Sequence, residues 1–258
     1  MPLPGIEEKV AFLSKPETYP NHVERVETKQ THMSWVFLTD TNAWKLKKPV
    51  RTEFLDFSTP KARRFDCEEE VRLNRRLARD VYQGVVPLTV NSQGDLQLGG
   101  HGEPVDWLVR MRRLPAERML DQLIARKDVS EPDISILASV LAAFYGKAPP
   151  IRITASQYRK RFAGHLETAR RELTQSEYGL PVNLVEPVVD AQLQFLEHHS
   201  SLLDDRVQTG KIIEAHGDLR PEHICLENPP VINRLSGIQP EPQNPRRGFG
   251  AYVFGAGV

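Results

Sequence analysis

The stretch EAHGDLRPEHICLENPPVI, residues 214–232, joins a His-Gly-Asp turn to a short apolar segment. Asp218 follows Gly217, so a tight turn here projects a carboxylate that can orient and deprotonate a hydroxyl nucleophile. His216 is placed to brace the turn, and Arg220 to pair with Asp218 or with a phosphate. A surface turn with solvated charges has the same local sequence. Whether the turn is catalytic or only a surface turn must therefore be judged from the sequence around it.

The chain before residue 115 is rich in short runs of Val, Phe, Trp and Thr separated by turn residues, which predicts an antiparallel sheet. In the run AWKLKKPV, side chains alternate along an extended backbone, so Ala43, Lys45 and Lys47 share one face. Trp44 and Leu46 share the other face. A charged segment with helical spacing, residues 61–82, predicts one helix inserted in the sheet. The predicted strands cover residues 23–28, 35–40, 43–50, 84–90, 95–100 and 104–114.

The pattern changes to helical spacing after Leu114. We therefore expect an α+β protein, with an antiparallel sheet lobe that carries one helix followed by a mainly helical lobe. The boundary is expected near Leu114-Pro115. The predicted helices cover residues 119–126, 132–147, 155–175 and 185–210.

Composition narrows the function classes. Of the 258 residues, 34 are Lys or Arg and 34 are Asp or Glu, so no global positive field favours nucleic acid, in spite of the basic runs KLKKPVR and KARR. Cys67 and Cys225 lie far apart, which argues against a disulfide scaffold. The beginning of the chain lacks the pattern of a signal peptide, and no run is long enough to span a bilayer. These features predict a cytoplasmic protein that binds neither nucleic acid nor a membrane.

The motif HGDLRPEHICL resembles the catalytic loop of aminoglycoside phosphotransferase-like kinases, which have the two-lobed protein-kinase-like fold. Residues 31–89 look like the N-terminal lobe of an uncharacterised bacterial branch of that family, and the resemblance covers nearly all of residues 20–232. It implies transfer of the γ-phosphate of ATP to a hydroxyl of an unknown small molecule, with magnesium or manganese as the metal. Nothing in the sequence specifies an aminoglycoside as the acceptor.

The resemblance also implies roles for residues of the first lobe. Lys45 or Lys47 matches the strand lysine that holds the nucleotide phosphates, and a small residue two positions before Lys45 would leave room for an adenine ring. Glu70 matches the helix glutamate that pairs with this lysine, with Glu69 as the alternative register. A solvated acidic helix start is the simpler interpretation of these acids. Met111 lies in the implied hinge, residues 109–115, where ordinary core packing is the competing role.

Two departures from the family pattern concern the metal. His223 stands where the wider superfamily has a metal-binding asparagine, and an imidazole suits transition metals better than magnesium. His223 is therefore either a metal ligand or a structural hydrogen-bonding residue. The family also has a metal-binding aspartate shortly after the loop, whereas residues 233–258 contain no Asp.

The last 26 residues, 233–258, are atypical in another way, because they lack helical periodicity where a helical lobe should continue. Synonymous codons exist that, read in a shifted frame, give a continuation resembling the family's own, with the missing Asp. We therefore expect a truncating frameshift near Ile232-Asn233, the alternative being a divergent tail. The chain is then divided into lobes 1–114 and 115–232 and an altered tail 233–258. Impaired transfer activity is expected, and a non-catalytic, pseudokinase-like nucleotide-binding or interaction module is the alternative function.

Overall fold

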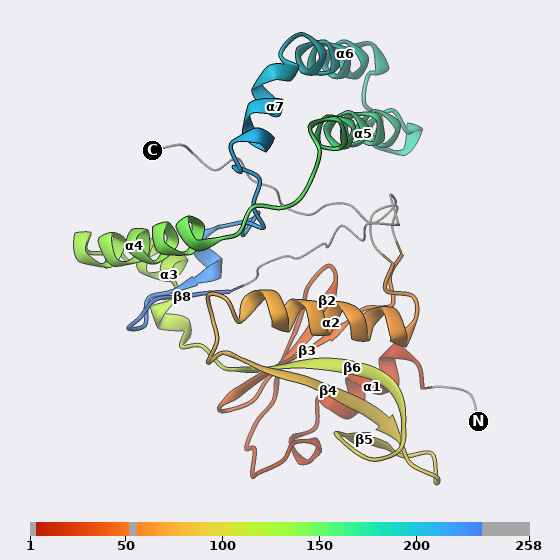
Figure 1. Cartoon of the computed structure of the whole chain (residues 1–258). Helices are drawn as coiled ribbons and strands as arrows, with labels where there is room; N and C mark the ends of the chain where they lie inside the picture. Colours follow the sequence, from red (N-terminus) through yellow and green to blue (C-terminus); the bar gives the residue numbers. More distant parts are fainter. Residues whose placement is uncertain (1–3, 52–55, 234–258) are drawn as a thin grey trace. The chain divides into compact units, whose positions relative to one another are not determined.

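The computed structural model describes residues 4–51 and 56–233, which fold as the mixed α+β protein that the sequence predicts (Figure 1). Within these residues, six antiparallel strands form one sheet in the order β1-β2-β3-β6-β4-β5, and two short strands form a separate hairpin. All the predicted strands are present with shifted ends. The strands are β1 (Glu27–Gln30), β2 (Ser34–Leu38), β3 (Asn42–Lys47), β4 (Tyr82–Val90), β5 (Leu96–Leu98), β6 (Glu103–Arg112), β7 (Ile224–Cys225) and β8 (Val231–Ile232).

The helices occupy the predicted regions, with one addition and two changes. Helix α1 was not predicted, α2 ends at Asn74 instead of continuing to residue 82, and the last predicted helix is divided at His199, whose backbone leaves the helical conformation. The helices are α1 (Ile6–Leu13), α2 (Pro60–Asn74), α3 (Leu120–Ala125), α4 (Glu131–Lys147), α5 (Ala155–Leu173), α6 (Val182–His198) and α7 (Ser200–Gln208).

The sheet is covered on both faces by helices (Figure 1). Trp44 and Leu46 of β3 point to the face covered by α1, where Val10 and Leu13 pack around them. The opposite face carries α2, and there Val109 of β6 belongs to the same apolar cluster as residues of this helix. The alternation predicted for β3 is therefore confirmed, and it separates an apolar face from a face that carries lysines.

A buried ion cluster joins both helices to the sheet. Asp106 on β6 accepts hydrogen bonds from Arg63 Nε at 2.7 Å and Arg63 Nη2 at 2.9 Å, and from Lys9 Nζ at 2.8 Å. All three side chains are buried. Lys9 belongs to α1 and Arg63 to α2, so one carboxylate fixes the position of a helix on each face.

The chain divides into two compact units, which are described separately. The first contains the described residues up to Phe144 together with 216–233, and the second contains residues 145–215. This division differs from the expected lobes 1–114 and 115–232. The reason lies in the hairpin β7–β8: Ile224 and Ile232 pack with Leu120 of α3 and Leu137 of α4, and Val231 packs against the cluster beneath α2. These contacts bind the His-Gly-Asp region to the sheet-containing unit.

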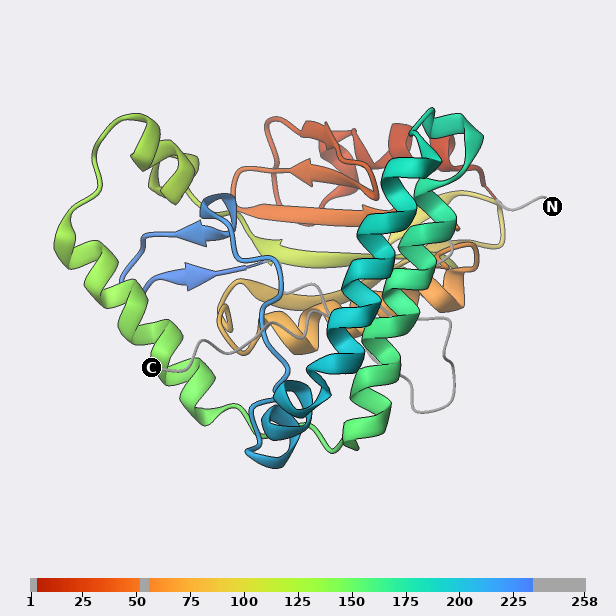
Figure 2. The same ribbon diagram turned by 90° about the horizontal axis from the view of Figure 1, so that it is seen from above.

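The second unit is a helical hairpin with a third helix attached. Helices α5 and α6 run antiparallel side by side, and α7 also packs on α5 (Figure 2). Tyr158, Leu203 and Ile212 form its buried cluster. On α6, Leu184 and Val188 lie one turn apart and are exposed, at 63% and 58%. The second unit therefore leaves an apolar face of α6 uncovered within the part of the chain that the structure describes.

The predicted altered tail, residues 233–258, lies outside the described residues except for Asn233, and residues 52–55 lie outside them as well. Within the described ranges, no helix combines the length and the apolar character needed to cross a bilayer.

Candidate functional site

The His-Gly-Asp turn is held in a conformation that requires its glycine. Gly217 has a φ of +82°, in the left-handed region that a residue with a Cβ adopts only with strain. The backbone N–H of Asp218 then donates to His216 Nδ1 at 3.3 Å. The turn that the sequence predicts is therefore present, and His216 braces it as expected.

Two buried histidines tie this turn to the strands that follow. His216 Nε2 lies 2.9 Å from the carbonyl oxygen of Asn233, and His223 Nδ1 lies 2.6 Å from the carbonyl oxygen of Asp218. The two rings stack with centroids 5.8 Å apart. Burial lowers the pKa of His216, which favours its neutral form. The imidazole of His223 serves the hydrogen bonding of the loop, so the geometry favours the structural alternative over the metal ligand.

The carboxylate of Asp218 takes no part in the histidine hydrogen bonds that hold the turn. Its side chain is 50% exposed, and its Oδ1 lies 3.2 Å from Arg220 Nε. The backbone of Asp218 is held at both its N–H and its carbonyl, so the carboxylate is accessible on a fixed support. A base of this kind must meet a hydroxyl within hydrogen-bond distance, and the exposure of Asp218 permits such an approach.

Asn233 is bound to the loop through its backbone. Its N–H donates to the carbonyl oxygen of His223 at 2.8 Å, and its own carbonyl accepts from His216. Its side-chain Oδ1 is buried and has no hydrogen-bond partner within the described residues. A buried amide oxygen without a partner in the described residues therefore stands beside the loop.

A second group of predicted residues meets between β3 and α2. Lys45 Nζ contacts Glu70 Oε1 at 2.9 Å, and Lys47 Nζ contacts Glu70 Oε2 at 2.7 Å. Lys47 also forms an ion pair with Asp66. The register alternative is decided by the helix: Glu69 points away and binds Arg72, one turn further along α2.

Electrostatics favours the charged forms of Glu70 and Lys47. Burial by itself raises the pKa of Glu70, but the attraction of Lys45 and Lys47 outweighs it and lowers the pKa to about 2. For Lys47, burial lowers the pKa, and the attraction of Glu70 and Asp66 raises it well above its ordinary value. The neighbouring Cys67 thiol has a pKa raised to about 12, chiefly by burial, and is therefore unreactive.

Met111 lies near the end of β6, opposite Ala43 of β3 and Tyr82 of β4 in the sheet register. Its side chain packs against the apolar cluster beneath α2. The register places the small Ala43 and Met111 side by side, two residues along the strand from Lys45. Both the core role and a place at the edge of a nucleotide site are compatible with this position.

Sequence reasoning missed three charged residues that organise these groups. Asp66 precedes Glu70 by one helical turn, a spacing that puts both on one face of a helix and was available as a signal. Arg112 and Glu227 form a two-bond ion pair at 3.0 and 2.6 Å, which links the end of β6 to the hairpin β7–β8. The hydrogen bond from Arg112 lowers the pKa of Glu227. Their separation of more than a hundred residues left no signal in the sequence.

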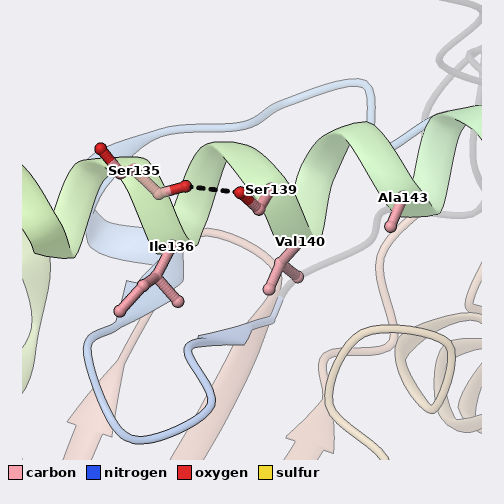
Figure 3. Close-up of a pocket in the computed structure, with 5 residues that line it drawn as sticks. All are labelled: Ser135, Ile136, Ser139, Val140 and Ala143. Carbon is pink, nitrogen blue, oxygen red and sulfur yellow. Dashed lines mark hydrogen bonds between the residues drawn. The ribbon is translucent and has the colours of Figure 1, made fainter.

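A shallow groove follows one side of α4 and is lined by Ser135, Ile136, Ser139, Val140 and Ala143 (Figure 3). The Ser139 hydroxyl donates to the Ser135 carbonyl oxygen at 2.8 Å, so both polar groups are satisfied within the helix. None of the predicted site residues lines this groove. No cluster of three or more His, Cys, Asp or Glu side chains suited to a metal occurs within residues 4–51 and 56–233.

No known family profile matches the chain. The uncharacterised protein Rv2004c of Mycobacterium tuberculosis is 31% identical over 206 residues, which make up 78% of this chain and 39% of the relative. The uncharacterised protein Mb2027c of Mycobacterium bovis matches with the same identity and the same coverage. The chain therefore spans about two fifths of the length of the curated relatives it matches.

Proposed function

We propose that this chain belongs to the aminoglycoside phosphotransferase-like kinases, with their two-lobed protein-kinase-like fold. In this proposal it binds ATP in the cytoplasm and transfers the γ-phosphate to a hydroxyl of a small molecule. The observation that carries the proposal is the contact of Glu70 with Lys45 and Lys47. A flexible ammonium group must be anchored before it can position phosphates, and a helix carboxylate provides that anchor. The braced carboxylate of Asp218 supports the same proposal.

In the proposed reaction each residue has a distinct task. A strand lysine, held by Glu70, binds the phosphates and lowers their mutual repulsion. Asp218 accepts a hydrogen bond from the acceptor hydroxyl and takes its proton as the hydroxyl oxygen bonds to the γ-phosphorus. The bond from this phosphorus to the β–γ bridging oxygen breaks, and ADP leaves. Arg220, beside Asp218, is placed to meet a phosphate oxygen or the substrate.

The oxygen atoms near the loop are of the type that magnesium binds, but only one of the two groups, the Asp218 carboxylate, carries a negative charge. Asp218 offers a carboxylate and Asn233 an amide oxygen without a partner in the described residues, and both are donors that magnesium accepts. When bound, the metal would neutralise charge between the phosphates. Because Asn233 is neutral and residues 233–258 contain no counterpart of the family's metal-binding aspartate, we expect weak metal binding and little turnover.

The lack of an aspartate in residues 233–258 supports the alternative function. A protein that binds a nucleotide without transferring phosphate would tolerate the loss of the metal-binding aspartate and a histidine committed to the loop, as His223 is. A non-catalytic, pseudokinase-like binding or interaction module is therefore the second candidate.

The two candidates are separated by introducing a carboxylate beside the loop, at Asn233. Isothermal titration of the chain with ATP and magnesium tests the nucleotide binding that the kinase and a nucleotide-binding module both require. Absence of ATP binding would overturn both and leave only an interaction module. The variant Asn233→Asp is then assayed for ATP hydrolysis against the unmodified chain. We expect it to raise magnesium-dependent turnover, and we expect Asp218→Asn in the same background to remove that gain. Unchanged turnover in Asn233→Asp with intact ATP binding would favour the module.

A further inference from the structure

Two lysines share one glutamate between β3 and α2, but their surroundings differ. The Lys45 side chain is 24% exposed and the Lys47 side chain 6%, although both contact Glu70. A residue that meets a soluble polyphosphate must be accessible, whereas a residue that only holds another in place need not be. The two lysines are therefore suited to different tasks.

Lys47 is fully engaged with the protein. An ammonium group has three N–H donors. One donates to Glu70 and a second serves the ion pair with Asp66, while the Phe57 ring centroid lies 5.2 Å from Nζ on a further side. Moving Lys47 toward a ligand would take the cation from the partly buried Asp66 and one of two cations from the buried Glu70, which is unfavourable.

Lys45 is only partly engaged. Its ammonium contacts one oxygen of Glu70 and keeps contact with solvent. The other oxygen of Glu70 is neutralised by Lys47, so Lys45 can take a second anionic partner without leaving the glutamate unpaired. Its position on the same strand face as Ala43, which lies opposite Met111, leaves little bulk on the side toward the end of β6.

We propose that Lys45 contacts the phosphates of a bound nucleoside triphosphate, and that Lys47, together with Asp66, is a positioning residue that keeps Glu70 in place for Lys45. This division rests on the proposed function, since it assumes that a nucleotide binds beside β3. It assigns Asp66 and Lys47 to the support of the phosphate site, and it makes Lys45 the group in direct contact with the ligand.

Affinity labelling of the unmodified chain tests the assignment of Lys45. The probe is an acyl phosphate of ATP. A lysine amine beside the phosphates attacks the acyl carbon, the bond from this carbon to the phosphate oxygen breaks, ATP leaves, and an amide forms as a proton passes to water. Peptide mass spectrometry then locates the label. We expect labelling of Lys45 that excess ATP prevents. ATP-preventable labelling of Lys47 would overturn the division while preserving the proposed function, and absence of such labelling at either lysine would overturn both.

The role of Lys47 is tested by a variant that keeps the charge balance, Lys47→Met with Asp66→Asn. The readout is the ratio of the affinities for ATP and for adenosine, because adenosine lacks the phosphates. We expect this ratio to fall about tenfold, the effect of weakening one charge-assisted contact, with adenosine affinity unchanged. In Lys45→Met the two ligands should bind with nearly equal affinity. Lys29→Met, which removes an exposed lysine of β1 in the same sheet, is the matched control and should leave the ratio as it was.

The two possible failures of this variant are informative in different ways. An unchanged ratio would show that Glu70 needs no support from Lys47 and would overturn the positioning role. A parallel loss of ATP and adenosine binding would show that Lys47 only maintains the fold, and it would overturn the role as well.

Discussion

Replacing Glu70 by glutamine removes the negative charge through which α2 binds Lys45 and Lys47 of β3. The amide has the size of the carboxylate but carries no charge. In Glu70→Gln, Lys45 loses its carboxylate partner and Lys47 keeps only Asp66. Because Lys47 is buried, the missing charge cannot be replaced fully by water.

The size of the effect follows from two independent considerations. Folding lowers the pKa of Glu70 from 4.5 to about 2, and at roughly 1.4 kcal/mol per unit this corresponds to about 3 kcal/mol of stability at neutral pH. Removing one member of a buried ion pair destabilises a protein by about 3–5 kcal/mol. Asp66 still neutralises Lys47, which favours the lower end. We therefore expect Glu70→Gln to lower the free energy of unfolding by about 3 kcal/mol.

The stability difference between the unmodified chain and Glu70→Gln must decrease as the pH falls. A carboxyl group whose pKa is lowered by folding stabilises the protein above its pKa in the unfolded chain, and this stabilisation is lost as the pH falls through the folded value. The difference between the unmodified chain and Glu70→Gln should be complete near pH 7. At pH 3 it should have fallen to roughly half, because the unfolded chain then binds the proton that Glu70 in the folded chain still resists.

Urea unfolding followed by tryptophan fluorescence measures this stability difference in the sheet-containing unit. The three tryptophans of the chain, Trp35, Trp44 and Trp107, all lie in the six-stranded sheet. The matched control is Glu69→Gln on the same helix, whose exposed pair with Arg72 should contribute less than about 1 kcal/mol. The reasoning would be refuted if both variants lost equal stability, or if the loss in Glu70→Gln were the same at pH 7 and pH 3.

Three further predictions concern other parts of the molecule. Asp106→Asn should lower the free energy of unfolding by about 3–5 kcal/mol in urea, because two buried cations lose their shared carboxylate; a loss below about 1 kcal/mol would contradict the buried cluster. Cys67 and Cys225 should react with a thiol reagent only in denaturant, since both are fully buried and burial raises the pKa of each, and rapid reaction of the native chain would contradict this packing. We expect the exposed apolar face of α6 to promote self-association, so Leu184→Ser should lower the mass measured by light scattering while changing the unfolding free energy by less than about 0.5 kcal/mol; a mass that does not change would contradict this role of the face.

The frameshift expected near Ile232-Asn233 is open to a direct test that needs no protein. We expect the DNA sequence across residues 229–258 to contain codons that encode the family-like continuation in a shifted frame. Codons that cannot yield such a continuation would leave a divergent tail as the explanation.

Several elements could be predicted from the sequence because their signals are local. The strand and helix regions followed from hydrophobic periodicity, which reports the repeat of the backbone itself. Helix α1 was missed although Ile6, Val10 and Leu13 have helical spacing and acids occupy its first turn, because the segment is short. The end of α2 at Asn74 was also missed, since charged residues with good helical propensity continue beyond it.

By itself, the sequence determined the alternation of β3, which puts Lys45 and Lys47 on one face and Trp44 and Leu46 on the other, because a strand repeats every two residues. It also determined the tight turn at Gly217. Only the tertiary structure decided that Glu70 and not Glu69 meets the lysines, that both lysines share it, and that the loop joins the sheet-containing unit. These facts depend on the rotation of α2 over the sheet and on contacts between residues far apart in the chain, which are set by the packing of whole elements and leave no periodic mark in the sequence.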